Sequence, residues 1–257
     1  MAALQSLLDF ALDVTWRAGR ITLRYFQTGI AVERKGDNSP VTLADRESEQ
    51  YLRGAINRYY PDHGIIGEEY GEQASRSEFR WIIDPIDGTK SFVSGVPLYG
   101  CLLALVERDH PIVGVAHFPA LDETISASVG GGCYWNGRRA RVSSVAKLEE
   151  ATLLASEISR TWENRLEAWR KLNASTYIQR TWGDAYGYAL VATGRAEMMF
   201  DPKMQIWDCA PFGVILPEAG GTFTDFKGNA TISAGESVAT NGALFDPVMA
   251  LLNDSQA

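Results

Sequence analysis

The chain has 257 residues, which is enough for one large domain or two closely joined subdomains with a substantial core. Hydrophobic residues make up 46% of it and no apolar run approaches a membrane-spanning length, so we expect a soluble globular protein without a membrane partner. The net charge of -8 argues against extended nucleic-acid binding, although a local cation-lined site could still admit a small anion. The amphipathic start, interrupted by Asp9 and Asp13, is unlike a signal peptide and predicts a cytoplasmic location.

The periodicity of apolar residues predicts helices over 3–27 and 42–60 and strands over 64–68 and 80–84. Three further strands, at 99–107, 111–118 and 123–129, are joined by short turns and predict an antiparallel meander. After a glycine-rich turn the pattern alternates between strands, at 151–156, 175–180, 196–200 and 222–225, and helices, at 161–173, 184–194, 208–219 and beyond Gly242. We therefore predict layered α/β packing in a single domain over 1–257, with at most a subdomain seam near 130–150.

The segment 81–90 carries the strongest signal for chemistry. A strand-like apolar run ends in Asp84 and Asp87, and Gly88 follows. Hard divalent cations prefer oxygen ligands, and two such ions can polarise both the attacking water and the leaving oxygen of a phosphate ester. An ordinary Asp-Pro turn that caps a helix is the structural alternative. Phosphatases that form an aspartyl-phosphate use two aspartates separated by one residue, whereas two residues separate these, so we do not predict a nucleophilic aspartate.

Other acids occur at similar places in the predicted pattern. The run 63–69 ends in Glu68 and Glu69, where strand ends of α/β proteins place ligand-binding groups, although either glutamate could be a solvated loop residue. Asp45 follows Thr42 by three positions and fits a helix N-terminal cap, which explains Thr42 more fully than Asp45. Asp208 precedes an apolar helical pattern, where a favourable interaction with the helix dipole is the simpler explanation.

Cysteine and histidine chemistry find little support in the sequence. The three cysteines, Cys101, Cys133 and Cys209, are widely spaced among apolar neighbours, so we predict buried or half-buried thiols. The three histidines show no helical metal-ligand spacing, which makes a zinc site improbable.

Taken together, the acids form a pattern that resembles a known family. Glu68-Glu69, the segment 84–89 and Trp207-Asp208, in this order and at these separations, resemble the inositol monophosphatase superfamily of magnesium-dependent, lithium-sensitive phosphatases. The resemblance covers nearly the whole chain. It implies an αβαβα five-layer sandwich, usually a homodimer, that hydrolyses a small-molecule phosphate ester with two to three Mg²⁺ ions per subunit.

The resemblance also implies a ligand set for these ions. Glu68, Asp84 and the carbonyl of Ile86 match the ligands of one Mg²⁺. Asp84, Asp87 and Asp208 match those of the second, so Asp84 would bridge the two, and Glu68 would reach a looser third site through water. Four carboxylates buried without cations would repel one another, and we therefore expect metal binding to stabilise the fold.

Further residues match the family's catalytic and phosphate-binding positions. Asp45 and Thr89 resemble the pair that orients and deprotonates the attacking water, together with Glu68 as a catalytic residue. The backbone amides of Gly88 and Thr89, beside Asp87, would bind the substrate phosphate, in agreement with the general affinity of helix starts for anions. Lys35 matches a loop lysine that approaches the metal site, and an ordinary solvated lysine is an equally good explanation.

The wall opposite the phosphate should determine the substrate. Inositol-specific members carry a small residue or a hydroxyl at the position of Asp184, while Asp201 matches the family's substrate-binding acid. Two acids suit a cationic substrate, which they can bind through charge-assisted hydrogen bonds. The segments 180–188, 192–197 and 87–92 resemble the histidinol-phosphate phosphatases of the superfamily most. The amine and imidazole of L-histidinol phosphate could pair with Asp184 and Asp201 and stack on Trp182, with Arg180 nearby.

Alternatives remain at this point. Trp182 and Tyr186 could be core aromatics and Asp184 a helix cap, in which case inositol phosphate, another small phosphomonoester or a bisphosphate would be the substrate. A metal-binding regulatory relative without turnover is a non-enzymatic alternative. It is disfavoured because the residues implied in metal binding and water activation are all present: Asp45, Glu68, Asp84, Asp87, Thr89 and Asp208.

Overall fold

The computed structural model describes residues 2–36, 39–156 and 166–253. The helices are α1 (Ala2–Leu23), α2 (Leu43–Tyr59), α3 (Thr89–Val93), α4 (Leu166–Ser175), α5 (Asp184–Ala192), α6 (Ile206–Cys209), α7 (Phe212–Ala219) and α8 (Phe245–Asn253). The strands are β1 (Glu33–Arg34), β2 (Pro40–Val41), β3 (Gly64–Gly67), β4 (Gly71–Gln73), β5 (Phe79–Asp87), β6 (Gly100–Glu107), β7 (His110–Phe118), β8 (Glu123–Ser128), β9 (Gly132–Trp135), β10 (Arg138–Arg139), β11 (Thr152–Ala155), β12 (Ile178–Arg180), β13 (Met198–Asp201), β14 (Thr222–Thr224) and β15 (Ser237–Thr240).

Most of the strands belong to two sheets. The larger sheet has the order β10-β9-β8-β7-β6-β5-β3-β4, in which the strands from β5 to β10 form an antiparallel meander and β3 runs parallel to β5. The smaller sheet has the order β12-β11-β13-β15-β14. In it β11 runs parallel to β12 and β13, and β15 runs antiparallel to β13 and β14. The predicted meander is confirmed.

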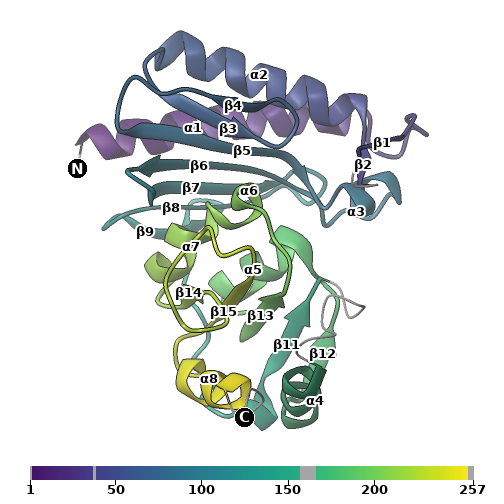
Figure 1. Cartoon of the computed structure of the whole chain (residues 1–257), viewed down its shortest axis with the longest axis vertical. Coiled ribbons are helices and arrows are strands. Elements are labelled where there is room, and N and C mark those ends of the chain that lie inside the picture. The colour runs from purple at the N-terminus through teal and green to yellow at the C-terminus, as the bar shows by residue number, and fades with distance from the viewer. Residues whose placement is uncertain (1, 37–38, 157–165, 254–257) are drawn as a thin grey trace.

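Helices cover both sheets and give five layers in the order αβαβα (Figure 1). One core, between α1, α2 and the larger sheet, encloses Trp81. A second core, around α5 and α7 between the sheets, encloses Tyr188 and Phe212, and a third, beneath α4 and α8, encloses Trp169 and Phe200. Burying one such side chain contributes about 1.5–3 kcal/mol. The predicted five-layer sandwich is confirmed, and the three cysteines are buried thiols as expected.

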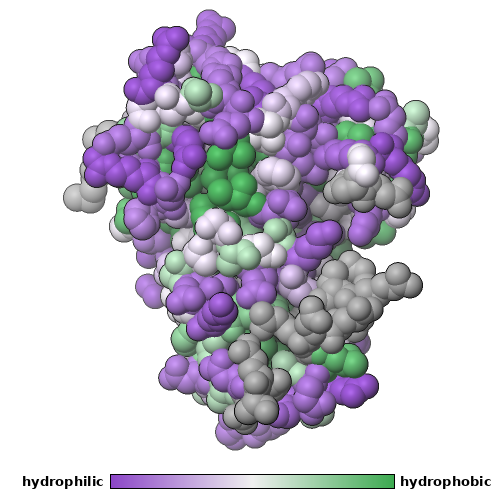
Figure 2. Space-filling view, in the orientation of Figure 1, coloured by the Kyte–Doolittle hydropathy of each residue, from purple (hydrophilic) through white to green (hydrophobic). Residues whose placement is uncertain are grey.

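The visible face of the molecule is mainly hydrophilic, with one contiguous apolar patch in its upper half (Figure 2). No helix in the part of the chain that the structure describes is both long and apolar enough to cross a bilayer. The chain passes from the larger sheet to the smaller one between Arg139 and Thr152, a segment that overlaps the range 130–150 of the predicted seam. The single-domain organisation stays a prediction.

A β-bulge at the end of β5 positions the two aspartates of the predicted turn. Asp84 pairs with Leu102 and Asp87 with Gly100, so two residues of β5 lie opposite one residue of β6. Pro85 has no N–H, and the N–H of Ile86 donates to Asp84 Oδ1 at 3.0 Å. In a regular strand, residues three apart point to opposite faces. The extra residue cancels this alternation and brings both carboxylates to one side.

Several boundaries differ from the predicted ones. The first helix ends at Leu23, and the predicted helix 208–219 is divided into α6 and α7 at Pro211, which has no N–H to donate to the preceding turn. The sequence pattern missed the short strands β1, β2, β4, β9 and β10 and also β15. The start of the predicted helix 161–173 lies outside the described residues.

Close packing of the larger sheet on α7 leads to a stability prediction. A Cβ at Gly114 would collide with the Pro211 carbonyl and lie 2.8 Å from Val214 Cγ1. We expect Gly114→Ala to lower the free energy of unfolding by about 1–3 kcal/mol, because overpacking displaces the helix from the sheet. Urea denaturation should show a lower midpoint with an unchanged m-value.

Gly54→Ala is the matched control. Gly54 lies in α2, and a Cβ there has no neighbour within 4 Å. The substitution should raise the free energy of unfolding by about 0.5–1 kcal/mol, because alanine is the better helix former. Equal effects of the two substitutions would contradict the packing argument.

Candidate active site

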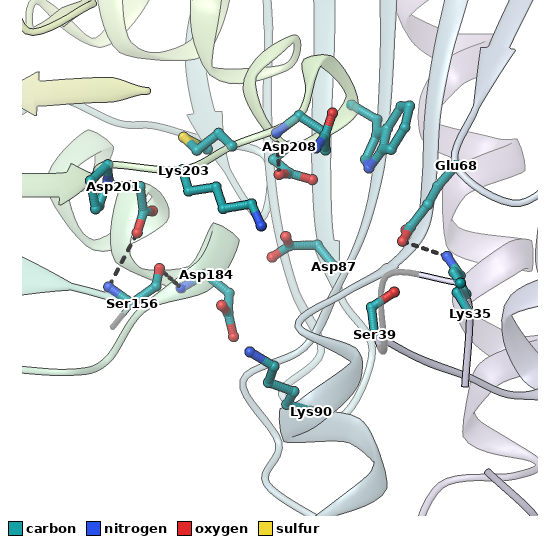
Figure 3. A pocket seen from close by; sticks show the side chains of 15 residues that line it. Lys35, Ser39, Glu68, Asp87, Lys90, Ser156, Asp184, Asp201, Lys203 and Asp208 are labelled. Atoms are coloured by element: carbon teal, nitrogen blue, oxygen red, sulfur yellow. Dashed lines mark hydrogen bonds and ion pairs between the residues drawn. The ribbon is translucent and has the colours of Figure 1, made fainter. Parts of the chain in front are cut away.

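A cavity of about 760 Å³ lies between the end of β5 and the segments that carry β13 and α6. Its wall comes from both halves of the chain: the β1–β2 hairpin, β5, α3, β13 and α6 all contribute (Figure 3). The lining residues are Lys35, Gly36, Ser39, Glu68, Asp87, Lys90, Ser156, Asp184, Asp201, Pro202, Lys203, Met204, Gln205, Trp207 and Asp208. Acids and lysines therefore share one space.

Three carboxylates predicted as metal ligands converge at this cavity. Among the described residues, Asp84, Asp87 and Asp208 form a group in which one oxygen of each lies within 4.8 Å of the others. Asp84 and Asp87 come from the bulged end of β5. Asp208 is the third residue of α6, where its Oδ2 accepts a hydrogen bond from Gln205 N at 2.8 Å. Its predicted place in the first turn of a helix is confirmed, and this capping role leaves its other oxygen for the cluster.

Burial and mutual repulsion raise the pKa values of this cluster. Burial, followed by the charges of Glu68 and Asp87, raises the pKa of Asp84 well above its ordinary value. Burial and neighbouring acids act in the same way on Asp87. Burial raises the pKa of Asp208 to about 7, although its cap hydrogen bond opposes the shift. A divalent cation would relieve this repulsion, and an all-oxygen donor set is what Mg²⁺ prefers.

Glu68 lies beside this group and is held by a lysine. Lys35 Nζ lies 2.7 Å from Glu68 Oε1 and 2.6 Å from Glu69 Oε1. Burial alone would lower the pKa of Lys35. The hydrogen bonds and charges of the two glutamates outweigh this effect and raise the pKa above its ordinary value. Lys35 is therefore an ion-paired residue of the site, and the solvated-lysine alternative is excluded.

The turn that carries Glu68 and Glu69 is fixed by a buried acid in α2. Glu49, which is fully buried, accepts hydrogen bonds from the backbone N–H groups of Glu69 at 2.8 Å and Tyr70 at 3.2 Å. Arg53 Nε donates to the same carboxylate at 2.7 Å. Gly67 permits this arrangement because a Cβ at that position would collide with Glu49. The sequence pattern did not single out Glu49.

Asp45 combines a structural contact with a free oxygen. Its Oδ2 accepts from Thr42 N at 2.8 Å and from Thr42 Oγ1 at 2.6 Å, which confirms the predicted capping box. Its Oδ1 is buried and has no hydrogen-bond partner among the described residues. Burial raises the pKa of Asp45 to about 6 against the effect of the Thr42 hydrogen bonds, so this carboxyl group can exchange a proton near neutral pH.

Thr89, the second member of the predicted water-activating pair, contacts Ile86. Thr89 Oγ1 donates to the Ile86 carbonyl at 3.1 Å, just past the left-handed Gly88, whose φ is 77°. Within the described ranges no hydrogen bond joins Thr89 to Asp45. While it donates to Ile86, the Thr89 hydroxyl can still accept a hydrogen bond through its lone pairs, and Asp45 Oδ1 is free to accept another.

Both acids predicted to bind substrate line the cavity. Asp201 is buried; its Oδ2 accepts from Tyr188 OH at 2.8 Å and its Oδ1 from Ser156 N at 3.3 Å. Burial raises its pKa to about 7, although these hydrogen bonds oppose the shift. Burial also raises the pKa of Asp184, which the Ser91 hydroxyl and the Lys90 charge oppose. Asp184 is not the helix cap, because Gly183 occupies that position.

The structure does not bring Trp182 and Arg180 to the cavity. The Trp182 ring is 46% exposed, and the Arg180 guanidinium lies 5.9 Å from its centre. Neither residue lines the cavity, whereas Trp207, next to Asp208, does. Tyr186 is half-buried and packs edge-on against Phe118.

Sequence reasoning missed several polar groups that line the site: Lys90, Lys203, Ser156, Ser39 and Gln205. Ser156 is the last residue of the predicted strand 151–156 and directly follows the observed β11, so the strand-end rule that selected Glu68 could have found it. Lys90 follows Thr89 in the most informative segment. The position of Lys203 depends on the loop between β13 and α6, which carries no comparable signal.

Comparison with known proteins decides the family. The family model described as the inositol monophosphatase family matches residues 3–257. The chain belongs to the inositol monophosphatase family. The family and the geometry of its site make it a phosphoric monoester hydrolase, as predicted.

Relatives of this family phosphatase cover almost its full length. It is 40% identical to a histidinol-phosphatase of Chlorobaculum parvum, over 97% of each chain, and 38% identical to a histidinol-phosphatase of Mycobacterium tuberculosis, over 96% of this chain and 97% of the relative. A solved structure described as a Thermotoga maritima IMPase is 32% identical and superposes with a TM-score of 0.89, covering 98% of each chain.

The raised pKa of Asp208 gives a pH prediction for the phosphatase in a chelator. The pKa of this carboxyl group is near 7 in the folded state and about 3.8 when the chain is unfolded. Its contribution to the free energy of unfolding therefore falls as pH rises from about 3.8 to 7, because ionisation is penalised only in the folded state. The melting temperature should therefore fall as pH rises from about 5 to 8. Asp208→Asn should reduce this fall and raise the melting temperature at pH 8 by roughly 2–4 °C.

Added Mg²⁺ provides the second arm of this measurement. At pH 8 it should raise the melting temperature of the wild type and have little effect on Asp208→Asn. Asp246→Asn, at an exposed position in α8, should follow the wild type in both arms. A wild-type melting temperature that rises with pH in the chelator would contradict the electrostatic argument.

Proposed function

We propose that this phosphatase hydrolyses L-histidinol phosphate to L-histidinol and phosphate by direct attack of water, with Mg²⁺ as its cofactor. The observation that carries the substrate assignment is the presence of Asp184 and Asp201 in the same cavity as Asp87 and Asp208. A phosphate at the metal-binding end of this cavity would leave the rest of the substrate facing these two acids. The names of the relatives from Chlorobaculum parvum and Mycobacterium tuberculosis favour the same substrate.

The proposed cofactor site uses the acidic group. Asp84, Asp87 and Asp208 would hold one Mg²⁺, and Glu68, Asp84 and the Ile86 carbonyl another. When bound, Mg²⁺ supplies positive charge that neutralises the phosphate and increases the acidity of water. Lys35 already places a positive charge between Glu68 and Glu69, which indicates that this part of the site accommodates a cation.

The remaining catalytic steps belong to side chains and backbone. Thr89 would orient the attacking water through its hydroxyl, and Asp45 would accept the proton at its unpartnered Oδ1. A carboxyl group whose pKa is about 6 can hold that proton transiently at neutral pH. The backbone amides of Gly88 and Thr89 would donate to phosphate oxygens.

Substrate recognition would rest on charge. The ammonium and imidazolium groups of histidinol can each donate to one of the two acids, and such charge-assisted bonds are stronger than neutral ones. Trp207, which lines the cavity, replaces Trp182 as the aromatic proposed to contact the imidazole. Lys90 and Lys203 limit the excess of negative charge in the same space.

Inositol phosphate, or another small phosphate ester, is the second candidate. The solved relative described as an IMPase supports it, as does the common metal site of the family. A phosphate-release panel of histidinol phosphate, inositol phosphate, fructose bisphosphate and adenosine bisphosphate in Mg²⁺ would distinguish the candidates. A homodimer in the cytoplasm completes the proposal.

The first prediction of the proposed function concerns the metal site. Asp84→Asn should reduce kcat by at least about 10³-fold, which corresponds to about 4 kcal/mol of lost transition-state stabilisation, because it removes the charge shared by both proposed ions. Phosphate release at saturating Mg²⁺ measures the effect, and Asp246→Asn should keep wild-type activity. A covalent phosphoenzyme trapped during turnover would overturn the direct-water mechanism.

The second prediction concerns specificity. Asp184→Asn and Asp201→Asn should each lower kcat/KM for histidinol phosphate by about 10- to 100-fold, because a desolvated cation loses its counter-charge. Inositol phosphate, which is neutral outside its phosphate, should change by less than about threefold. Steady-state kinetics on both substrates separate this effect from damage to the metal site, which would depress both alike.

A further inference from the structure

Asp184 is held in place by two serines and by an unusual backbone conformation. Its φ of 52° lies in the left-handed region, which residues other than glycine rarely adopt. Ser156 Oγ accepts a hydrogen bond from Asp184 N at 2.7 Å, which fixes the backbone in this conformation. Gly183 allows the close approach, because a Cβ there would collide with the Ser156 backbone.

Ser156 also contacts the second acid. Its backbone N–H donates to Asp201 Oδ1 at 3.3 Å, so one residue at the end of β11 touches both Asp184 and Asp201 (Figure 3). The spacing of the two carboxylates therefore depends on Ser156. A cationic substrate that donates to both acids needs this spacing, whereas a substrate recognised only through its phosphate does not.

The side chain of Asp184 is directed by the segment that follows Thr89. Ser91 Oγ donates to Asp184 Oδ2 at 3.4 Å, and Lys90 lines the same part of the cavity. Gly88 leaves room for this carboxylate, because a Cβ there would lie 2.8 Å from Asp184 Oδ2. The carboxylate, at the start of α5, is thus held against Gly88 and the first turn of α3.

We propose that Ser91 and Ser156 are positioning residues that set the preference for a cationic substrate by fixing the Asp184 carboxylate relative to Asp201. The inference rests on the proposed function, because it explains how the same cavity would select histidinol phosphate. Neither serine takes part in the chemical step. Their removal should change KM for the cationic substrate and leave the metal site unchanged.

The test measures kcat and KM for histidinol phosphate and inositol phosphate in Ser91→Ala and Ser156→Ala. Each substitution should raise KM for histidinol phosphate by about fivefold to tenfold, with kcat within about twofold of wild type and little change on inositol phosphate. Ser91→Thr keeps the hydroxyl and should restore the wild-type KM. Ser94→Ala, an exposed position at the end of α3, should have no effect.

A double-mutant cycle with Asp184→Asn distinguishes positioning from direct substrate contact. If the serines act through Asp184, their effect on KM should vanish in the Asp184→Asn background. A full additive effect, or equal losses on both substrates, would overturn the positioning role while leaving the substrate assignment intact. A wild-type enzyme that prefers inositol phosphate would instead overturn the proposed function, and the positioning role with it.

Discussion

The concentration of like charge at the bulged end of β5 is the constraint on which the site depends. Asp84 and Asp87 are buried, Asp208 is half-buried beside them, and Glu68 is close. Burial together with mutual repulsion raises the pKa values of the three aspartates. In a medium of low dielectric constant such a group is unfavourable unless protons or cations compensate it. The protein supplies part of that compensation through Lys35. The remaining repulsion would favour the proposed binding of a divalent cation.

Supporting contacts hold this group in place without adding positive charge at its centre. Asp84 Oδ1 accepts from the Ile86 N–H, Asp87 Oδ2 accepts from Ala185 N at 2.5 Å, and Asp208 Oδ2 caps α6. Each contact occupies one oxygen of a carboxylate and fixes the direction of the other. The acids are therefore preorganised for a ligand even though their charges oppose one another.

The fold could be predicted from the sequence where hydrophobic periodicity was long and regular. The meander strands and α2 were placed within a few residues, because their buried faces repeat over many positions. Short edge strands such as β4 and β10 were missed because two or three residues carry no periodicity. The division at Pro211 was visible in the sequence, but the apolar pattern on both sides favoured one continuous helix.

The site followed from the sequence to the extent that its residues stand at strand ends. Asp84 and Glu68 met this rule, whereas Asp208 lies in the first turn of a helix. The resemblance joined these acids although more than a hundred residues separate Asp87 from Asp208. Contacts between distant segments gave no such signal. Glu49 and the exposure of Trp182 depend on how separate layers pack, which a single sequence does not encode in any local pattern.

The proposed metal-binding and substrate-selecting parts of the site are joined through the start of α5. Ala185 N donates to Asp87, a proposed metal ligand, while the adjacent Asp184 points to the proposed substrate. A change in the backbone there would therefore affect both parts. The side chain at position 184 can change without loss of the hydrogen bond to Asp87, because the backbone N–H of Ala185 donates that bond. If the proposed assignment holds, replacing this one side chain would change the substrate preference and leave the proposed metal ligands in place.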